Sequence, residues 1–218
     1  MGRLVNAETP EQGLVYDAKN LAFILPAGKY IGNSRYKDVF AASAMADLTS
    51  FRNHWGAETS LDVELYRPVA RYELVAKDVA TFLNKLSTGG LKGESFTARV
   101  KYSDYLPTGY NLWDDVPKNS LMYMEYKVAF ERPADGTKEL ILGFDYVLTD
   151  AGETVSIPVE LEILNEKNEV LARTAFRIPC ERGKNTTVRG NFLTSDANGG
   201  IGIDPDYDGD LEVDLGEL

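Results

Sequence analysis

TVSIPVELEIL, at residues 154–164, and VLARTAFRI, at residues 170–178, determine the fold class of this chain. In both stretches apolar side chains alternate with polar ones, so that one row is buried and the other faces water, as in a half-buried β-strand. Asn165–Asn168 (NEKN) separates them and supplies asparagine, which tolerates the positive φ of a tight turn. We therefore predict a hairpin here and a mainly β protein.

The same alternation recurs upstream of this hairpin. Asp150–Glu153 and Pro133–Gly136 each place a glycine where a tight turn needs positive φ. One helix is predicted over Asp78–Leu86, with Asp78 as its N-cap residue, because its apolar residues share a face. The other predicted strands are residues 69–75, 96–102, 122–130 and 139–148. Together these elements predict an antiparallel β-sandwich of the transthyretin-like or immunoglobulin-like sort, and the pattern leaves open which topology applies.

The first third of the chain contains shorter apolar runs. They are Leu21–Ile24 (LAFI), Asp38–Ala42 (DVFAA) and Ser60–Tyr66 (SLDVELY), of which the last alternates cleanly as a strand. A boundary is predicted at Arg67–Pro68, because proline lacks the ladder donor and biases its predecessor toward extended geometry. We predict two unequal domains, a remnant or small N-terminal β domain at residues 1–66 and a C-terminal sandwich at residues 67–218.

Composition limits the classes of partner. The formal net charge is −11 and the basic residues are scattered, whereas phosphate binding needs clustered Lys and Arg, so a nucleic-acid partner is not expected. No window approaches the roughly 18 uninterrupted apolar residues of a membrane helix. The N-terminus, as it stands, lacks the basic segment and apolar core of an export signal. Cys180 is the only cysteine, so the chain forms no internal disulfide.

The sequence contains few residues in patterns that support catalysis. His54 has no partner at a nucleophile or metal spacing, and Cys180 follows Pro179 without a neighbouring histidine. Both are interpreted as packing or loop residues. Since no phosphate-binding loop or serine-nucleophile motif occurs either, we predict that the protein is not an enzyme and uses no cofactor.

An acidic run near the C-terminus resembles the beginning of a calcium-binding loop. Asp204, Asp206, Asp208 and Asp210 alternate, with a glycine at the sixth position of the run. The twelfth position, however, is Leu215 where an EF-hand has a bidentate glutamate, and no helix is predicted beside it. Alternating acids on a strand can equally be solvated, so Ca²⁺ binding by these residues stays open.

Four landmarks occur in an order that resembles one family. Arg177–Thr194 (RIPCERGKNTTVRGNFLT) is an apolar strand that passes through proline into a basic Asn/Thr-rich turn. We predict a strand switch or corner at Pro179–Arg189 and a further strand at Asn191–Thr194. The whole segment resembles the closing segment of the fimbrillin-like surface proteins of Bacteroidota. Leu65–Leu74 (LYRPVARYEL) resembles the opening strand of their second domain, and the loop Leu106–Val116 resembles their Pro-x-Gly-aromatic-Asn connection. Upstream, Leu25–Tyr30 (LPAGKY) is similar to their Leu-Pro-x-Gly-x-Tyr turn, whereas Cys180 and Gly183 depart from the expected pattern.

The resemblance implies two transthyretin-like sandwiches, the first incomplete, in a cell-surface structural or adhesive protein of fimbrial (pilus) type. It also implies export and a lipid anchor at the outer membrane, supplied by a precursor region upstream. Its partners would be other fimbrial subunits or further copies of itself, joined by β-strand addition, with a glycan or host protein as adhesion target. The candidate donor is Leu211–Leu218, in which Leu211, Val213 and Leu215 would fill pockets. Alternatively, this run is the last strand of its own sandwich.

A second hypothesis is a surface module that binds carbohydrate or peptide. Tyr105, Tyr110 and Trp113 cluster in one long predicted loop, together with Tyr102. Exposed aromatic rings stack on sugar faces. The same rings can instead cover one end of the sandwich as a small core.

Overall fold

The computed structural model of the chain describes residues 15–17, 23–26, 28–195 and 212–217. These residues form one α-helix, α1 (Val79–Ser87), and two short 3-10 helices, η2 (Arg35–Lys37) and η3 (Thr49–Phe51). None of the described helices is long and apolar enough to span a membrane. The strands are β1 (Tyr16–Asp17), β2 (Phe23–Pro26), β3 (Val69–Ala76), β4 (Ser95–Tyr102), β5 (Leu106–Asn111), β6 (Val116–Leu121), β7 (Glu125–Glu131), β8 (Leu140–Leu148), β9 (Val155–Asn165), β10 (Val170–Cys180), β11 (Lys184–Gly190) and β12 (Glu212–Glu217).

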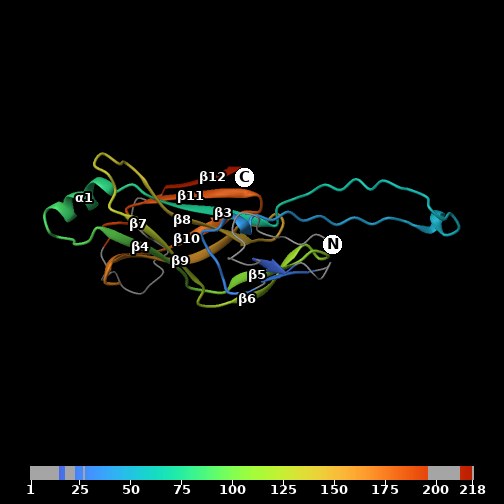
Figure 1. Ribbon diagram of the computed structural model, residues 1–218, viewed down its shortest axis with the longest axis horizontal. Coiled ribbons are helices and arrows are strands. Elements are labelled where there is room, and N and C mark those ends of the chain that lie inside the picture. Colours follow the sequence, from blue (N-terminus) through green and yellow to red (C-terminus); the bar gives the residue numbers. More distant parts are fainter. Residues whose placement is uncertain (1–14, 18–22, 27, 196–211, 218) are drawn as a thin grey trace.

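The protein is a mainly β sandwich, as predicted. One sheet has the order β10-β9-β4-β7 and the other the order β12-β11-β3-β8, and the two lie in layers over each other (Figure 1). Every described neighbour pair is antiparallel except β3 and β11. The alternation in β9 and β10 fulfils its predicted role, because Ile163 and Phe176 belong to the buried core between the sheets. Tyr72 of β3 is also buried there.

A third sheet, of order β1-β2-β5-β6, lies at the side of the sandwich (Figure 1). In it Ile24 of β2 pairs with Tyr110 of β5, so the pairing joins the N-terminal part of the chain to residues beyond Arg67–Pro68. A small second core, which includes Tyr16, Ile24 and Tyr110, packs against this sheet. The division into domains at residues 66 and 67 stays a prediction.

The segment predicted as a loop at residues 106–116 contains strand β5 and the first residue of β6 instead. Burial of Leu106, Thr108 and Tyr110 marks the inner face of β5, and the turn to β6 includes Asp115 at φ 58. Gly109 lowers the strand propensity of this segment, so the sequence pattern does not predict β5. A Cβ at position 109 would lie 2.9 Å from Ile24 O and 2.7 Å from the carbonyl oxygen of Lys118. The glycine is therefore needed for the close approach of three strands.

The strand assignments within Arg177–Thr194 also need correction. The chain changes sheet at residues 181–183, where Gly183 has φ 74, so a strand switch lies within Pro179–Arg189 as predicted but occupies only three residues. The next strand is β11, at residues 184–190, whereas Asn191–Thr194 is not a strand. Thr186 is polar yet buried in β11, and its hydroxyl is satisfied there because Oγ1 donates to Pro179 O at 2.5 Å. Sequence alternation alone did not reveal that pairing.

Residues 42–65 form an extended arm that leaves the body of the protein (Figure 1). Its base is closed by a bridge between Ala41 and Tyr66, with N···O distances of 2.8 and 2.9 Å. Its regular structure is limited to η3 near the tip. The strand predicted over residues 60–66 is thus absent from the described sheets, and the apolar run at residues 38–42 forms no strand either, because neither run has a partner strand beyond that single bridge.

The predicted helix is present as α1, but the function of Asp78 differs from the prediction. Val79, Phe82 and Leu83 are buried on its inner face, as expected. The Asp78 carboxylate makes no capping hydrogen bond to the helix. It accepts instead from Leu193 N at 3.0 Å and from Thr194 N and Oγ1 at 2.8 Å each, and so it anchors the segment that follows β11.

Candidate functional site

A buried polar cluster surrounds Asp145 in the middle of β8. Asp145 is fully buried and lies opposite the segment that contains η2. Lys37 Nζ donates to Asp145 Oδ1 at 2.7 Å, and Tyr102 OH donates to Oδ2 at 2.7 Å. Tyr30 OH donates to the same carboxylate. One carboxylate therefore holds donors from three separate segments of the chain.

The hydrogen bonds continue into the sandwich core through further tyrosines. Tyr72 OH lies 2.7 Å from Tyr102 OH and 3.1 Å from Tyr126 OH. Burial, followed by the negative charge of Asp145, raises the pKa of Tyr30 well above its ordinary value, and burial likewise raises the pKa of Tyr102. These phenols keep their protons at all ordinary pH values, so they act as fixed hydrogen-bond donors and acceptors.

Lys37 balances the charge of this cluster. Burial lowers the pKa of its ammonium group, and the nearby Asp145 carboxylate opposes that effect. The pair links the N-terminal segment to β8 with both side chains shielded from water. Such an arrangement fixes two segments relative to each other, and this is the chemistry that the geometry supports.

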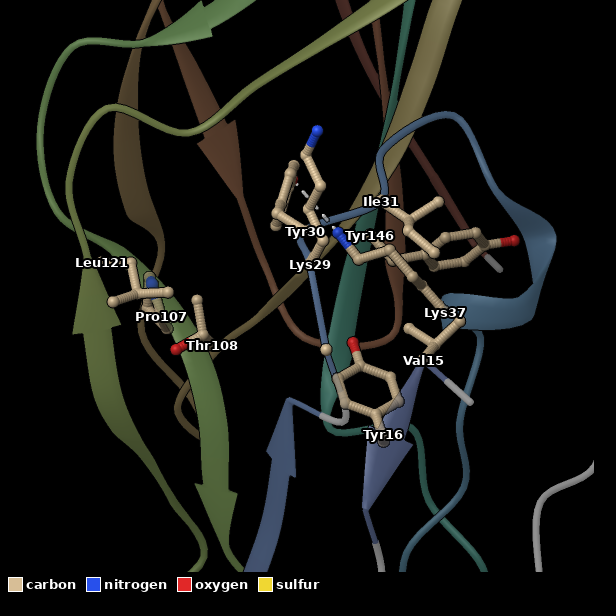
Figure 2. A pocket seen from close by; sticks show the side chains of 11 residues that line it. Val15, Tyr16, Lys29, Tyr30, Ile31, Lys37, Pro107, Thr108, Leu121 and Tyr146 are labelled. Carbon is tan, nitrogen blue, oxygen red and sulfur yellow. Dashed lines mark hydrogen bonds between the residues drawn. The ribbon is translucent and has the colours of Figure 1, made fainter. Parts of the chain in front are cut away.

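A small cavity lies beside the cluster (Figure 2). Its volume is about 40 Å³, which accommodates a water molecule but is far below the roughly 300 Å³ at which small-molecule pockets begin. Among the described residues, the buried Thr108 Oγ1 has no hydrogen-bond partner, and the same residue lines this cavity. The cavity lining comprises Val15, Tyr16, Gly28, Lys29, Tyr30, Ile31, Lys37, Pro107, Thr108, Leu121 and Tyr146.

The three aromatic residues predicted as a ligand-binding loop lie in different environments. Tyr105 is 62% exposed just before β5, and Trp113 is 73% exposed in the turn after it. Tyr110, within β5, is fully buried, and its OH donates to Asp115 Oδ1 at 2.8 Å. Arg182 Nη1 in turn donates to Tyr110 OH at 3.0 Å. The two exposed rings therefore stand at opposite ends of a six-residue strand, about 20 Å long at the usual rise.

The predicted strand-donor segment is partly described. β12 pairs antiparallel with β11 of its own chain, with Val213 opposite Val188 and Leu215 opposite Thr186. Leu211 lies outside the described residues. The register sets the two candidate pocket-filling positions beside buried positions of β11, and use of this strand between chains stays a prediction.

The other residues considered from the sequence contribute no reactive centre in the described part of the chain. His54 is exposed near the tip of the arm. Cys180 is buried at the end of β10, and this burial raises the pKa of its thiol to about 12. Asp204, Asp206, Asp208 and Asp210 lie outside the described residues. Within the described ranges, no group of three or more His, Cys, Asp or Glu residues is arranged to hold a metal ion.

Sequence reasoning missed the Lys37–Asp145 pair and the arm. Lys37 and Asp145 are 108 residues apart and carry no motif. The one available signal was Asp145 itself, a carboxylate placed within the apolar run of β8, since a buried charge requires a partner. The arm left a signal too, because Ser60–Tyr66 alternates like a strand yet has no matching neighbour.

Comparison with known proteins gives a family and three structural neighbours. The model of a family described as "Family of unknown function (DUF6562)" matches residues 3–216. None of the curated proteins matches this chain. A structure from Bacteroides ovatus has 11% identity and a TM-score of 0.41 over 90% of this chain and 66% of that one. One from Bacteroides eggerthii has 13% identity and a TM-score of 0.36 over 72% of this chain and 57% of that one.

A third structure, from Parabacteroides distasonis, has 12% identity and a TM-score of 0.36 over 69% of this chain and 52% of that one. All three are described as a "putative cell adhesion protein". This chain therefore spans between 52% and 66% of the length of these proteins.

Proposed function

We propose that this chain, which belongs to the DUF6562 family, is a non-enzymatic structural and adhesive protein of the bacterial cell surface. Within that class we assign it to the fimbrillin-like proteins, as a fimbrial subunit exported to the outer membrane. The landmarks quoted above, from Leu25–Tyr30 to Arg177–Thr194, support this assignment. Joining of subunits would occur by β-strand addition, with other fimbrial subunits or further copies as partners.

The position of β12 is the observation that supports assembly best. Among the described strands, β12 is a six-residue edge strand with β11 as its neighbour. An edge strand can be exchanged between identical chains, because pairing with a second copy reproduces the same backbone hydrogen bonds. Its register, with Val213 and Leu215 opposite buried positions of β11, would give such an exchange a defined alignment.

Removal of the terminal strand tests this proposal. Full-length chain should form ladders on SDS gels run without boiling, and a variant that lacks residues 211–218 should not. A synthetic peptide of residues 211–218 should bind the shortened variant, while a matched peptide with Val213→Asn and Leu215→Asn should bind more weakly. Absence of ladders from the full-length chain, together with no binding of the peptide, would contradict assembly through this strand.

A ligand-binding module is the second candidate, supported by the exposure of Tyr105 and Trp113. A glycan array with the intact protein tests it, and Trp113→Ala should abolish any signal. Trp55→Ala is the matched control, because Trp55 is fully exposed but lies on the arm. Equal binding by both variants would exclude the Trp113 end of the hairpin as the contact.

A further inference from the structure

The arm at residues 42–65 carries a concentration of apolar surface. Among the described residues it holds six of the thirteen large apolar side chains that are exposed: Met45, Leu48, Trp55, Leu61, Val63 and Leu65. Single exposed apolar residues are ordinary, but exposed apolar surface that is concentrated in one place is typical of an interaction site. The arm extends away from the sandwich of the same chain (Figure 1), and these side chains are exposed.

The second limb of the arm, Ser60–Leu65, has the pattern of a β-strand without a partner. Leu61, Val63 and Leu65 are 54%, 45% and 63% exposed and alternate with Asp62 and Glu64. No backbone hydrogen bond joins residues 60–65 to another described residue. Extended backbone with unused donors and acceptors, and apolar side chains at every second position, is the chemistry by which a segment adds to an open sheet edge.

An edge that fits this limb occurs in the protein itself. β10 is an edge strand of eleven residues, and β9 is its partner among the described strands. Its inner row, which includes Phe176 and Ile178, is buried, and its outer row carries Arg173 and Arg177. An added strand whose outer row is acidic would place its carboxylates beside these guanidinium groups, and opposite charges across neighbouring strands stabilise the pair.

We propose that the limb Ser60–Leu65 adds as a strand to the outer edge of β10 in a second copy of this chain. The apolar row would then extend the buried face of the β10-β9-β4-β7 sheet, and Asp62 and Glu64 would lie on the face of Arg173 and Arg177. This contact does not rest on exchange of β12, because it uses a different segment and a different sheet.

A proline scan of the limb tests the proposal. In an added strand the N–H groups of every second residue point at the acceptor edge. Of two adjacent residues, proline at one therefore removes a hydrogen bond to the acceptor strand, and proline at the other does not. The scan is made in the variant that lacks residues 211–218, so that exchange of β12 does not contribute. In this background we expect self-association, measured by sedimentation velocity, to be lost in either Val63→Pro or Asp62→Pro and retained in the other. Both substitutions should leave the melting temperature unchanged, since these residues lie outside the sandwich. Equal association by the two proline variants, or a monomeric background variant, would overturn the proposal.

Charge exchange and cross-linking identify the acceptor. Arg177→Glu should weaken association severalfold, and Glu64→Arg combined with it should restore association. Arg177 is exposed and donates to Ser156 Oγ at 3.2 Å, so folding should tolerate the change. A photoreactive residue at position 63 should label residues 170–178 of an isotopically distinct copy. Labelling within one copy, or of another segment, would overturn the assignment.

The variant that lacks residues 211–218 separates the two modes of assembly. If the arm acts as proposed, this variant still associates and still gives the cross-link to residues 170–178. Loss of the ladders with retention of the arm cross-link would support both proposals. If the shortened variant still forms ladders, the proposed exchange of β12 is contradicted and the arm contact is not. If the shortened variant loses the cross-link, the arm contact depends on β12 and the proposal of an independent contact is contradicted.

Discussion

Lys37 Nζ lies 2.7 Å from Asp145 Oδ1, and the two side chains are 6% and 0% exposed. This buried ion pair joins the segment before the arm to the centre of β8. The carboxylate accepts further hydrogen bonds from Tyr102 OH and from Tyr146 N at 2.8 Å. The N-terminal segment is thus attached to the sandwich by a charge that has no access to bulk water.

Replacement of Lys37 by methionine should destabilise the protein by about 3–5 kcal/mol, because it leaves the Asp145 charge buried without a counter-ion. Urea unfolding at neutral pH measures this change. Adding Asp145→Asn should recover part of the loss, since the amide carries no charge. Lys29→Met is the control, because Lys29 borders the same cavity but is exposed. If the two single substitutions change the free energy of unfolding equally, the Lys37–Asp145 ion pair does not contribute to stability as proposed.

The stability of the protein should fall on acidification because of Glu162. Its side chain is fully buried on β9 and accepts from Arg173 Nη2 at 2.7 Å and from Arg99 Nε at 2.6 Å, with Lys101 Nζ at 3.0 Å. Burial opposes ionisation, but the hydrogen bonds from Lys101, Arg99 and Arg173 prevail and lower the pKa of Glu162 to about 2. The folded state thus binds this proton less readily than the unfolded chain, whose glutamate has a pKa of about 4.3.

The sign of the pH effect follows from that difference. The contribution of Glu162 is complete above the unfolded pKa and is lost as the pH falls through the folded value of about 2. Urea unfolding of the parent at a series of pH values between neutral and strongly acidic conditions should show this decline. Glu162→Gln should be less stable at neutral pH and should show a shallower decline below the unfolded pKa. Parallel pH profiles for parent and variant would refute this assignment.

The sequence predicted those strands whose side chains alternate and whose partners are close in the chain. β9 and β10 are the clearest examples, since Ile163 and Phe176 alternate with polar residues and a short turn joins the strands. β5 and β11 were not predicted, because Gly109 and the polar run Lys184–Gly190 lower the β-propensity of these segments. They form strands because they pair with strands that are distant in the sequence.

Long-range polar contacts were beyond the reach of sequence patterns. Nothing local to Asp145 identifies Lys37 as its partner, and the pairing depends on how the N-terminal segment crosses β8. Ser60–Tyr66 illustrates the opposite error. Its alternation predicts that one face of an extended segment is buried against apolar residues, but the pattern does not show whether those residues belong to the same chain.

Replacement of Asp78 by alanine should destabilise the segment after β11 more than α1. The carboxylate bonds Leu193 N and Thr194 N, of which the former is buried, and an unpaired buried N–H costs about 1–3 kcal/mol. Hydrogen exchange should show faster exchange at Leu193 and Thr194, with little change in the first turn of α1. If the amides of Ala80 and Thr81 lose protection instead, Asp78 acts mainly as a helix cap.

Gly32 lies where the N-terminal segment packs on the tyrosine cluster, and alanine there should destabilise the protein. A Cβ at this position would lie 2.3 Å from Tyr126 Cδ1, and the Tyr126 ring cannot easily withdraw because its OH bonds Tyr72 OH at 3.1 Å inside the core. Overpacking of this kind costs about 1–3 kcal/mol. Gly28→Ala is the matched control, since a Cβ at Gly28 meets no atom within 4 Å. Thermal unfolding should separate the two variants by several degrees, and equal melting temperatures would show that the segment at Gly32 can shift away from β7 without cost.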